Sequence, residues 1–376
     1  MPARALEFSE SPVLRNSLGS PPESLARTLL DWYHRERRTL PWRGSRNPYR
    51  IWISEVMLQQ TQAAVVVPYY RRFLKRFGNV KALAAAELTQ VLELWSGLGY
   101  YSRARNLHAA ARAIVAQGAF PSTLAGLQAL PGFGPYTAAA VGSIAFDLPE
   151  PAIDGNAVRV YARLVGLRAP RAEAEPRLRE LARPLLGAGP PGDLNQAIMD
   201  LGQLVCRARA PSCPACPWRR MCRAHREGTT GEIPIRTQAP PRRDLIEAAA
   251  RVTRKGTILL ARRREQGLFG GLWELPAVAL PRSRAKQPAN PSVLRDLLRR
   301  TLRRELGLAA SIGRELGSVD RTLTHLRLKL IAFDAEATGR PRAAAGGRYL
   351  EARFVPETEI ARLGLSSASR KLLSVL

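Results

Sequence analysis

One glutamate stands in mostly apolar company in the stretch PYRIWISEVMLQQTQ, residues 48–62. Pro48 can open a helix there, and the apolar residues that follow recur at helical spacing, which predicts a helix with one face packed inward. Trp52 and Leu58 lie three positions from Glu55 on that helix. Because burial disfavours the charged form of a carboxyl, we expect the pKa of Glu55 to rise toward neutrality, as a general acid requires. The alternative is a glutamate on the helix surface.

All the cysteines of the chain fall within one short segment, with the spacing Cys-x6-Cys-x2-Cys-x5-Cys: Cys206, Cys213, Cys216 and Cys222. Four thiolates this close can enclose one tetrahedral centre, either zinc or an iron–sulfur cluster, and the spacing alone leaves both open. Four thiolate ligands leave no open position for a substrate, so we expect a structural role. The alternative is four unrelated buried thiols. Five arginines that suit phosphate contact surround the segment: Arg207, Arg209, Arg219, Arg220 and Arg223.

Two glycines and an aspartate mark the middle of the chain. Gly132 and Gly134, in LPGFGPYTAAAV, predict a tight turn between two helices. The N–H groups of such a turn and of the following helix can bind a phosphate without reading the base sequence, although a plain helix–helix corner has the same residues. Asp154, in PAIDGNAVRV, is most simply the N-cap of the next helix, and Asn156 could be a similar local cap.

The elements that must position these residues are helical. Residues 23–225 are predicted to form an all-α domain, since no run in them alternates as a strand does. Residues 1–22 are expected to be a loose leader. Besides the helix after Pro48, helices are expected at about 23–37, 62–77, 80–86, 87–95, 103–117, 122–129, 135–146, 155–167, 175–186 and 193–205, with a turn at 187–192.

The pattern changes after residues 226–243, whose proline, glycine and polar content is typical of a linker. Two strands around a turn at Lys255-Gly256, a strand in THLRLKLIAF and a helix at 291–308 predict a mixed α/β domain over residues 244–376. The expected fold class is therefore multidomain, with an all-α domain that carries the cysteine segment followed by an α/β domain.

Arginine dominates the charge of the chain. Lys and Arg number 58 against 31 Asp and Glu, which gives a formal net charge of +27, and only six of the cations are lysines. Guanidinium groups match phosphate oxygens, so we expect a nucleic-acid partner; an arginine-rich genome would explain part of the excess but hardly the imbalance of sign. The chain has neither an export signal nor a membrane-spanning window, so we expect a cytoplasmic protein, nucleoid-associated if bacterial, without disulfides.

Several motifs together resemble the base-excision DNA glycosylases related to endonuclease III, and among them the MutY adenine glycosylases. In order over residues 24–225 they are LPWR, WISEVMLQQTQ, LWSGLGYYSRARNLH, LPGFGPYTA, DGN, NQAIMDLG and the cysteine segment. The resemblance implies a helix–hairpin–helix fold and a [4Fe–4S] cluster rather than zinc. It also implies removal of adenine from double-stranded DNA that contains A·8-oxoG or A·G mispairs, by a protein expected to be monomeric.

One position separates the branches of this superfamily. In the endonuclease III branch a lysine in the hairpin attacks the sugar and cuts the strand. Tyr136 stands at the matching place here, and no lysine lies between residues 81 and 255. A Schiff-base nucleophile is therefore lacking, and we expect no efficient lyase step. A glycosylase/lyase for oxidised pyrimidines and a non-enzymatic, metal-stapled DNA-binding protein are the competing hypotheses.

The resemblance assigns roles to single residues. It implies that Glu55 protonates N7 of adenine, and that Asp154 stabilises the resulting sugar cation or bonds to it transiently. It implies that Tyr136 and Asn156 position these two acids. Other residues are implied in opening the duplex or lining the adenine pocket: Gln60 and Tyr100 as wedges, and Trp42, Arg43 and Gln196 in the pocket.

The C-terminal part resembles the Nudix fold in GLFGGLWELPAV, residues 267–278, and in the helix that ends RRELGL. Nudix hydrolases hold Mg²⁺ with a run of glutamates on that helix. Here Glu305 remains, while Arg304 and Thr301 stand at the preceding acidic places, so we expect no catalytic divalent ion. The resemblance implies a fold reused for binding.

The base expected to be bound by this domain is 8-oxoguanine, opposite the target adenine. In the MutY family a Phe-Ser-His turn reads that base. Leu323-Thr324-His325 occupies the same place here, so Thr324 and His325 are the expected readers, without the aromatic residue. A β-turn with a buried histidine is the alternative.

Overall fold

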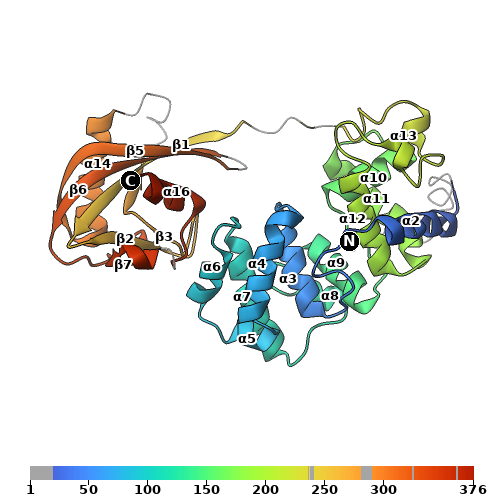
Figure 1. The fold of residues 1–376 in the computed structure, drawn as a ribbon, viewed down its shortest axis with the longest axis horizontal. Helices are drawn as coiled ribbons and strands as arrows, with labels where there is room; N and C mark the ends of the chain where they lie inside the picture. Colours follow the sequence, from blue (N-terminus) through green and yellow to red (C-terminus); the bar gives the residue numbers. More distant parts are fainter. Residues whose placement is uncertain (1–19, 236, 238–240, 281–289, 324–325, 361–362) are drawn as a thin grey trace, which may run out of the picture. The chain divides into compact units, whose positions relative to one another are not determined.

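The computed structural model describes residues 20–235, 237, 241–280, 290–323, 326–360 and 363–376 (Figure 1). Contacts between Cα atoms divide the chain into two compact units. The first unit contains residues up to 84 and residues 109–238, and the second contains residues 85–108 and 239–376. Residues 85–108 therefore group with the C-terminal residues, although the sequence places them inside the helical half.

The first unit is all-helical in its described residues, as the apolar periodicity predicts. Its helices are α2 (Pro22–Glu36), α3 (Pro48–Leu58), α4 (Ala63–Arg76), α5 (Val80–Ala84), α8 (Leu124–Gln128), α9 (Pro135–Phe146), α10 (Gly155–Val165), α11 (Arg171–Gly187), α12 (Pro191–Leu204) and α13 (Arg223–Arg226), with a 3-10 turn η1 at Cys213–Ala215. The turn expected at 187–192 is shorter than predicted. Pro191 opens α12, because a proline is well suited to the first helical position.

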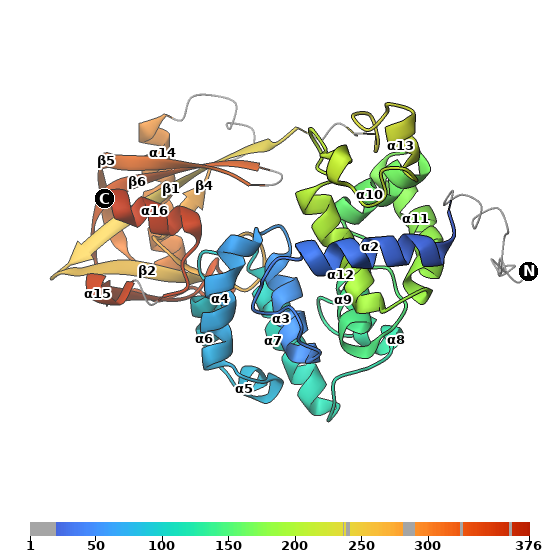
Figure 2. The same cartoon turned by 45° about the vertical axis from the view of Figure 1, so that its right-hand side comes forward.

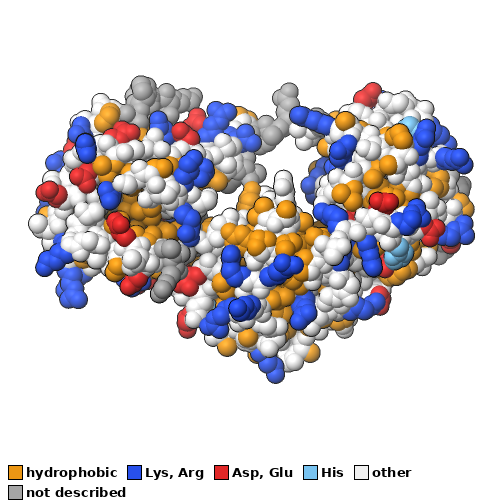
Figure 3. Space-filling view, in the orientation of Figure 1, with side chains coloured by type: hydrophobic (Ala, Val, Ile, Leu, Met, Phe, Trp, Pro, Cys, Tyr) orange, Lys and Arg blue, Asp and Glu red, His pale blue; other side chains and the backbone are white. Residues whose placement is uncertain are grey.

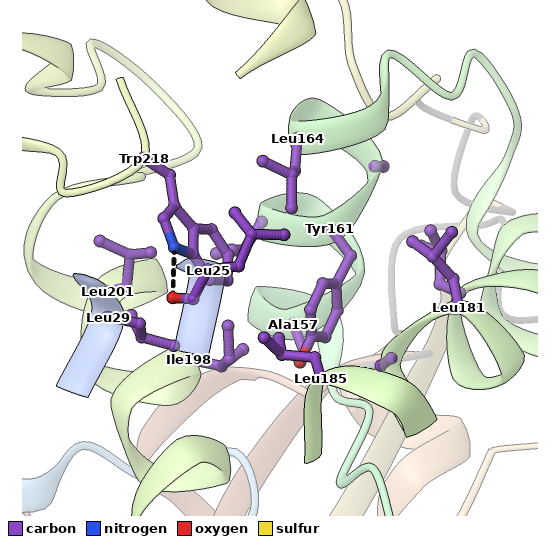
Figure 4. Close-up of a cluster of buried hydrophobic side chains, with 14 of the residues drawn as sticks. Leu25, Leu29, Ala157, Tyr161, Leu164, Leu181, Leu185, Ile198, Leu201 and Trp218 are labelled. Carbon is purple, nitrogen blue, oxygen red and sulfur yellow. Dashed lines mark hydrogen bonds between the residues drawn. The ribbon is translucent and has the colours of Figure 1, made fainter. Parts of the chain in front are cut away.

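A buried cluster joins α2, α10, α11 and α12 and positions the cysteine segment against them (Figure 4). Trp218 lies in that segment and is 2% exposed. Its indole Nε1 donates a hydrogen bond of 3.0 Å to the Leu25 carbonyl of α2, so the ring is fixed by a polar contact as well as by packing. Helix α2 also packs along α12 (Figure 2).

The second unit has a mixed sheet with helices. Its strands are β1 (Arg243–Arg254), β2 (Thr257–Arg263), β3 (Trp273–Glu274), β4 (Ala277–Ala279), β5 (Ala309–Thr322), β6 (Leu326–Thr338) and β7 (Tyr349–Pro356). Its helices are α6 (Leu88–Trp95), α14 (Pro291–Leu306), α15 (Glu357–Ile360) and α16 (Ser367–Val375); α7 (Ser102–Ala116) begins in this unit and ends in the first.

The sheet is covered on both faces. Its main order is β3-β2-β1-β6-β5, with β1 parallel to β6, β4 paired with β1 and β7 paired with β2. Alternate residues of the central strands point to opposite faces. Ala250 and Phe333 pack with the apolar stripe of α14, whereas Ala249 and Ala332 pack on the face that α16 covers (Figure 2).

The first two strands form the predicted hairpin. Lys255 has a φ of +48° and Gly256 a φ of +73°. These left-handed values are those of a type I′ turn, whose twist matches the twist of the flanking strands. The strand expected in THLRLKLIAF is β6, and the helix expected at 291–308 is α14. Both sequence predictions are confirmed, and the fold class is confirmed with them.

Basic side chains are spread over the visible surface of each unit (Figure 3). This distribution accords with the excess of 58 Lys and Arg over 31 Asp and Glu in the whole chain. Among the residues that the structure describes, every helix is too short or too polar to cross a bilayer.

Candidate active site

An open cavity in the first unit gathers most of the residues singled out from the sequence. Its lining comes from the loop before α3, from α3 and the turn after it, from the hairpin before α9 and the start of α9, and from α10, α11 and α12. The predicted residues in this lining are Trp42, Arg43, Glu55, Gln60, Gly132, Gly134, Tyr136, Asp154, Asn156 and Gln196. The structure thus brings both expected acids to one cavity.

Glu55 reaches the cavity from the middle of α3. The helix begins as the sequence predicts, with Pro48 in its first turn and the Asn47 side chain accepting a hydrogen bond of 3.1 Å from the Arg50 N–H. Glu55 is 5% exposed. Burial raises the pKa of its carboxyl, with a smaller contribution from Asp154, and outweighs the lowering by a hydrogen bond from Tyr136 and by the Arg43 charge.

Tyr136 lies in the first turn of α9 and connects the acid to its surroundings. Its hydroxyl donates a hydrogen bond of 2.9 Å to Glu55 Oε2 and lies 3.6 Å from the Met199 sulfur. Burial, together with the nearby carboxyls of Glu55 and Asp154, holds the pKa of Tyr136 well above its ordinary value. The phenol therefore stays neutral and remains a hydrogen-bond donor to the glutamate.

Asp154 is the N-cap of α10, so the simplest interpretation of the sequence is confirmed. Its Oδ1 accepts backbone N–H bonds from Asn156 at 2.9 Å and Ala157 at 2.7 Å. Its Oδ2 accepts a bond of 2.9 Å from the Asn156 amide side chain. Three hydrogen bonds are thus donated to its two carboxyl oxygens at the start of α10. The cap also holds the Asp154 side chain at the cavity wall, so one residue can cap α10 and still face a bound substrate.

Arg159 links Asn156 to the cysteine segment, a contact that sequence reasoning missed. Its Nη2 donates to Asn156 Oδ1 at 2.8 Å and to the Gly202 carbonyl at 2.7 Å. Its Nε donates to the Cys206 carbonyl at 2.7 Å. One guanidinium therefore joins the group that orients Asp154 to the first cysteine.

Arg43 is fixed by residues that the sequence did not single out. It donates to Asp200 Oδ1 at 3.1 Å and also to the Tyr33 hydroxyl. Arg38 contacts the same Asp200 oxygen at 2.5 Å, and Asp200 is fully buried. The sequence hints at Asp200 in one way: it lies in the NQAIMDLG motif, which also contains Gln196.

The two other expected pocket residues also lie at the cavity. Trp42 is 5% exposed and meets the Tyr70 ring edge to face, with 5.3 Å between centroids. The Gln196 amide nitrogen donates to the Gly192 carbonyl within α12, at 3.1 Å. A neighbour that sequence reasoning passed over, Asn195, donates to the Glu150 carbonyl at 2.9 Å and accepts from the N–H of residue 152 at 3.0 Å. It thereby fixes the segment that leads to Asp154.

The glycine turn before α9 closes the cavity on another side. Gly132 has a φ of +77°, which explains the glycine there, whereas Gly134 caps α9 with an ordinary φ of −73°. Apart from its two chain neighbours, no described residue has an atom within 4 Å of where a Gly134 side chain would begin. Phe133, between the two glycines, stacks on Trp52 of α3 with 5.4 Å between ring centroids. The turn is thus held against the helix that carries Glu55.

The two expected wedge residues share an unusual backbone. Gln60 has a φ of +56° and Tyr100 a φ of +50°, and both side chains are exposed. A left-handed backbone is uncommon for such residues and persists where the surroundings enforce it, often at functional turns. Gln60 lies at the rim of the cavity, whereas Tyr100 belongs to the second unit.

The four cysteines line one pocket of the first unit together with Arg163 and Arg219. Arg163 is 2% exposed, and its Nη1 lies 3.4 Å from Cys206 Sγ. Its other partners are backbone carbonyls, among them that of Ile233 at 2.9 Å. No carboxylate pairs with Arg163 in the described part of the chain, so a group with anionic thiolates would balance its buried charge. The donor set therefore fits a cysteine-ligated centre. No three His, Cys, Asp or Glu side chains among the described residues converge on a single-ion site.

Three buried glutamates of the second unit, Glu247, Glu274 and Glu305, contact arginines. Arg263 contacts Glu247 at 3.0 Å and Glu274 at 2.6 Å, and all three side chains are buried. Arg348 contacts Glu247 at 2.6 Å, and its backbone N–H donates to Glu305 at 2.6 Å. These contacts place arginines against the carboxyl oxygens of this region.

The turn that carries the expected readers of 8-oxoguanine is described only at its ends. Leu323 donates its N–H to the Leu326 carbonyl at 2.8 Å, which closes the connection from β5 to β6. Thr324 and His325 lie outside the described residues.

Comparison with known proteins identifies two families of domains in the chain. Residues 53–184 match the model of the HhH-GPD superfamily of base excision DNA repair proteins, and residues 248–375 match the NUDIX domain. The chain is 33% identical to an adenine DNA glycosylase of Rattus norvegicus, over 93% of this chain and 77% of that protein. It is 34% identical to one of Arabidopsis thaliana, over 92% of this chain and 63% of that protein. A thermostable thymine-DNA glycosylase of known structure is 29% identical, with a TM-score of 0.50, over 55% of this chain and 97% of that one.

Proposed function

Because the chain belongs to the adenine DNA glycosylase family, we propose that it releases adenine mispaired with 8-oxoguanine or guanine in double-stranded DNA, by hydrolysis of the N-glycosidic bond. The observation that carries the proposal is the cavity in which a buried, pKa-raised Glu55 and a multiply hydrogen-bonded Asp154 both lie. One carboxyl kept protonated and another kept ionised is the division of labour that glycoside hydrolysis needs.

The proposed reaction begins after the adenine has been swung out of the duplex, at a cost of roughly a few kcal/mol. Glu55 gives its proton to N7 of the base, and the bond between C1′ and N9 breaks with its electrons going to the base, which departs neutral. Asp154 stabilises the positive charge that develops at C1′, or bonds to it transiently. Water then adds to C1′, where it replaces any bond to Asp154, and its proton returns to Glu55, so that Glu55 is again an acid and Asp154 again a carboxylate.

The hydroxyl of Tyr136 supports this assignment of roles. It donates to Glu55 at 2.9 Å, and it occupies the place at which a lyase of this superfamily has a lysine. A Schiff base requires a primary amine, which a phenol lacks. We therefore propose that the enzyme leaves an abasic site and does not cut the strand efficiently.

Alkali distinguishes this function from its competitors. The protein is incubated with a duplex that holds one A·8-oxoG pair, and the strand that carried the adenine is analysed before and after treatment with alkali. Cleavage only after alkali supports an adenine glycosylase without lyase activity. Cleavage before alkali would indicate a glycosylase/lyase, and no cleavage would indicate a non-enzymatic DNA-binding protein.

The cofactor proposed for the cysteine pocket is a [4Fe–4S] cluster, held by Cys206, Cys213, Cys216 and Cys222. Four cysteines are the ligand set of zinc and of iron–sulfur centres alike, and family resemblance favours the cluster. When bound, the group would clamp the basic segment. Iron and sulfide analysis of the purified protein tests the proposal independently of activity, since zinc alone would contradict it.

Recognition of 8-oxoguanine is assigned by resemblance to Thr324 and His325, in the turn between β5 and β6. The proposal is tested by comparing adenine release from A·8-oxoG, A·G and A·C pairs. We expect the unaltered protein to prefer A·8-oxoG, and we expect Thr324→Ala to weaken that preference while the A·G rate changes little. An equal loss on all pairs would contradict a reading role for Thr324.

A further inference from the structure

The turn that presents Tyr100 is held in an unusual conformation. Gly97 and Gly99 have φ values of +104° and +73°, and Tyr100 itself has a φ of +50°. The tyrosine ring is 47% exposed, so burial of that ring does not explain why the strained backbone persists. The cause must lie in the residues that flank the turn.

Two side chains fix the turn from within. The Trp95 indole donates to the Gly99 carbonyl at 3.1 Å. Arg103 donates to the Leu98 and Gly99 carbonyls, both at 3.2 Å, and its guanidinium lies 5.5 Å from the centre of the Tyr100 ring. Cation–π contact of this kind limits the directions that the exposed ring can take. The backbone that carries Tyr100 is therefore fixed by hydrogen bonds before DNA binds.

Two further side chains tie the turn to the C-terminal residues of the same unit. Tyr101, which is 6% exposed, accepts the Gly97 N–H at 3.3 Å and donates its hydroxyl to the Leu365 carbonyl at 2.8 Å. Ser96, on the other side of the turn, donates to the same Leu365 carbonyl at 3.1 Å. One backbone oxygen thus receives a hydroxyl from each flank of the turn.

Leu365, which accepts these two hydrogen bonds, belongs to the C-terminal sheet domain, residues 244–376. The residue before Leu365, Gly364, accepts the Trp273 N–H of β3 at 2.9 Å. Arg370 of α16 donates to the Ser96 hydroxyl at 2.8 Å, and Arg105 of α7 donates to the Gly270 carbonyl at 2.7 Å. These contacts explain why residues 85–108 group with the C-terminal unit.

We propose that the C-terminal sheet domain positions the Tyr100 wedge, with Tyr101 and Ser96 as the positioning residues that connect them. The domain expected to bind 8-oxoguanine would then also hold the side chain that opens the duplex, so that recognition of the damaged base and extrusion of the adenine depend on one compact unit. The inference rests on the proposed function, in which Tyr100 is a wedge.

The test measures base opening separately from base release. The full-length protein binds a duplex with 2-aminopurine at the adenine position opposite 8-oxoguanine, and the rise in fluorescence reports unstacking. Tyr101→Phe removes the hydroxyl that joins Gly97 to Leu365, and we expect the opening equilibrium to fall by about fivefold to tenfold. Arg370→Ala changes an exposed residue and removes the hydrogen bond to Ser96, and we expect it to lower the opening equilibrium as well. The control is Tyr161→Phe, whose buried hydroxyl has no partner among the described residues.

A second substrate separates positioning from general damage to the fold. Mismatches on both sides of the A·8-oxoG pair lower the cost of unstacking, so the single-turnover rate of Tyr101→Phe should return to within about twofold of the unaltered protein. Unchanged fluorescence in Tyr101→Phe and Arg370→Ala, or an equal loss of rate on both duplexes, would overturn the inference. Failure of the unaltered protein to release adenine would instead refute the proposed function, since fluorescence still reports opening.

Discussion

At the scale of single residues, the environment of Glu55 determines what its carboxyl can do. Desolvation raises the pKa, and the Tyr136 hydroxyl opposes that rise because it donates to the charged form. Asp154 lies at the same cavity but has three donors to its oxygens. The two side chains thus differ in hydrogen bonding and burial, and the raised pKa of Glu55 is what the sequence predicted from its apolar neighbours.

Tyr136→Phe should shift the alkaline limb of the pH–rate profile to higher pH. Loss of the donated hydrogen bond removes a contact that favours the carboxylate, so the pKa of Glu55 rises further and its acid form persists to higher pH. The measurement is the single-turnover rate of adenine release across pH, with Tyr161→Phe as the matched control. A shift of the limb to lower pH would contradict the assignment of Glu55 as the acid.

Glu55→Gln should stabilise the fold at about pH 8 and change it little near pH 4. The folded protein holds the Glu55 proton more tightly than the unfolded chain, so stability falls as pH rises from the ordinary value of 4.5 through the raised folded pKa. The glutamine side chain has no proton to lose in this pH range, so the stability of Glu55→Gln does not fall in this way. Thermal unfolding at both pH values measures the difference, and Glu87→Gln, at an exposed position, serves as the control. A gain that is the same at both pH values would argue against a raised pKa.

At the scale of elements, α10 connects the site to the cysteine segment through Arg159. Apolar spacing predicted the helices around the site, and Pro48, Gly132 and Asp154 marked where they begin or turn. Arg159 could not be chosen from the sequence, because its partners at Asn156 and Cys206 are brought to it only by packing. Strand β5 was missed for another reason: most of its side chains are exposed or half-buried, so it lacks an apolar alternation.

Arg159→Met should slow adenine release and loosen the cysteine segment together. The methionine keeps the aliphatic stem but leaves Asn156 Oδ1 and the Cys206 and Gly202 carbonyls without their donor, at a cost of about 1–3 kcal/mol for each buried acceptor left unpaired. Iron content and unfolding temperature measure how well the cysteine segment is held, and single-turnover rates measure adenine release at the site. Arg112→Met, at an exposed position of α7, is the control. A variant with normal rate and normal iron content would show that the link has no role.

At the scale of the whole molecule, two properties cannot be assigned to a single contact: the net charge and the division of the chain into two units. The net charge of +27 is a strong attraction for phosphates. The assignment of residues 85–108 to the sheet-containing unit was beyond sequence reasoning, since those residues carry the same helical pattern as their neighbours. The site in the first unit and the turn that carries Tyr100 in the second thus depend on long-range packing that local periodicity does not encode.

The affinity for DNA should fall steeply with salt. Each phosphate neutralised by arginine contributes a slope of about −0.9 to a plot of log affinity against log salt concentration, so roughly six contacts would lower affinity by about a thousandfold between 50 and 200 mM salt. Arg220→Ala, in the cysteine segment, should reduce the slope by about one. Binding of an undamaged duplex at several salt concentrations measures both values. A flat plot would show that the basic surface does not contact DNA.

The most direct test of the two-acid site is single-turnover adenine release from an A·8-oxoG duplex by the unaltered protein, Glu55→Gln and Asp154→Asn. The account predicts a loss of about 10²-fold to 10⁴-fold or more in each variant. DNA affinity should stay within about threefold, and Asp154→Asn should melt normally, because asparagine also caps helices. Turnover near the unaltered rate in either variant would contradict the account.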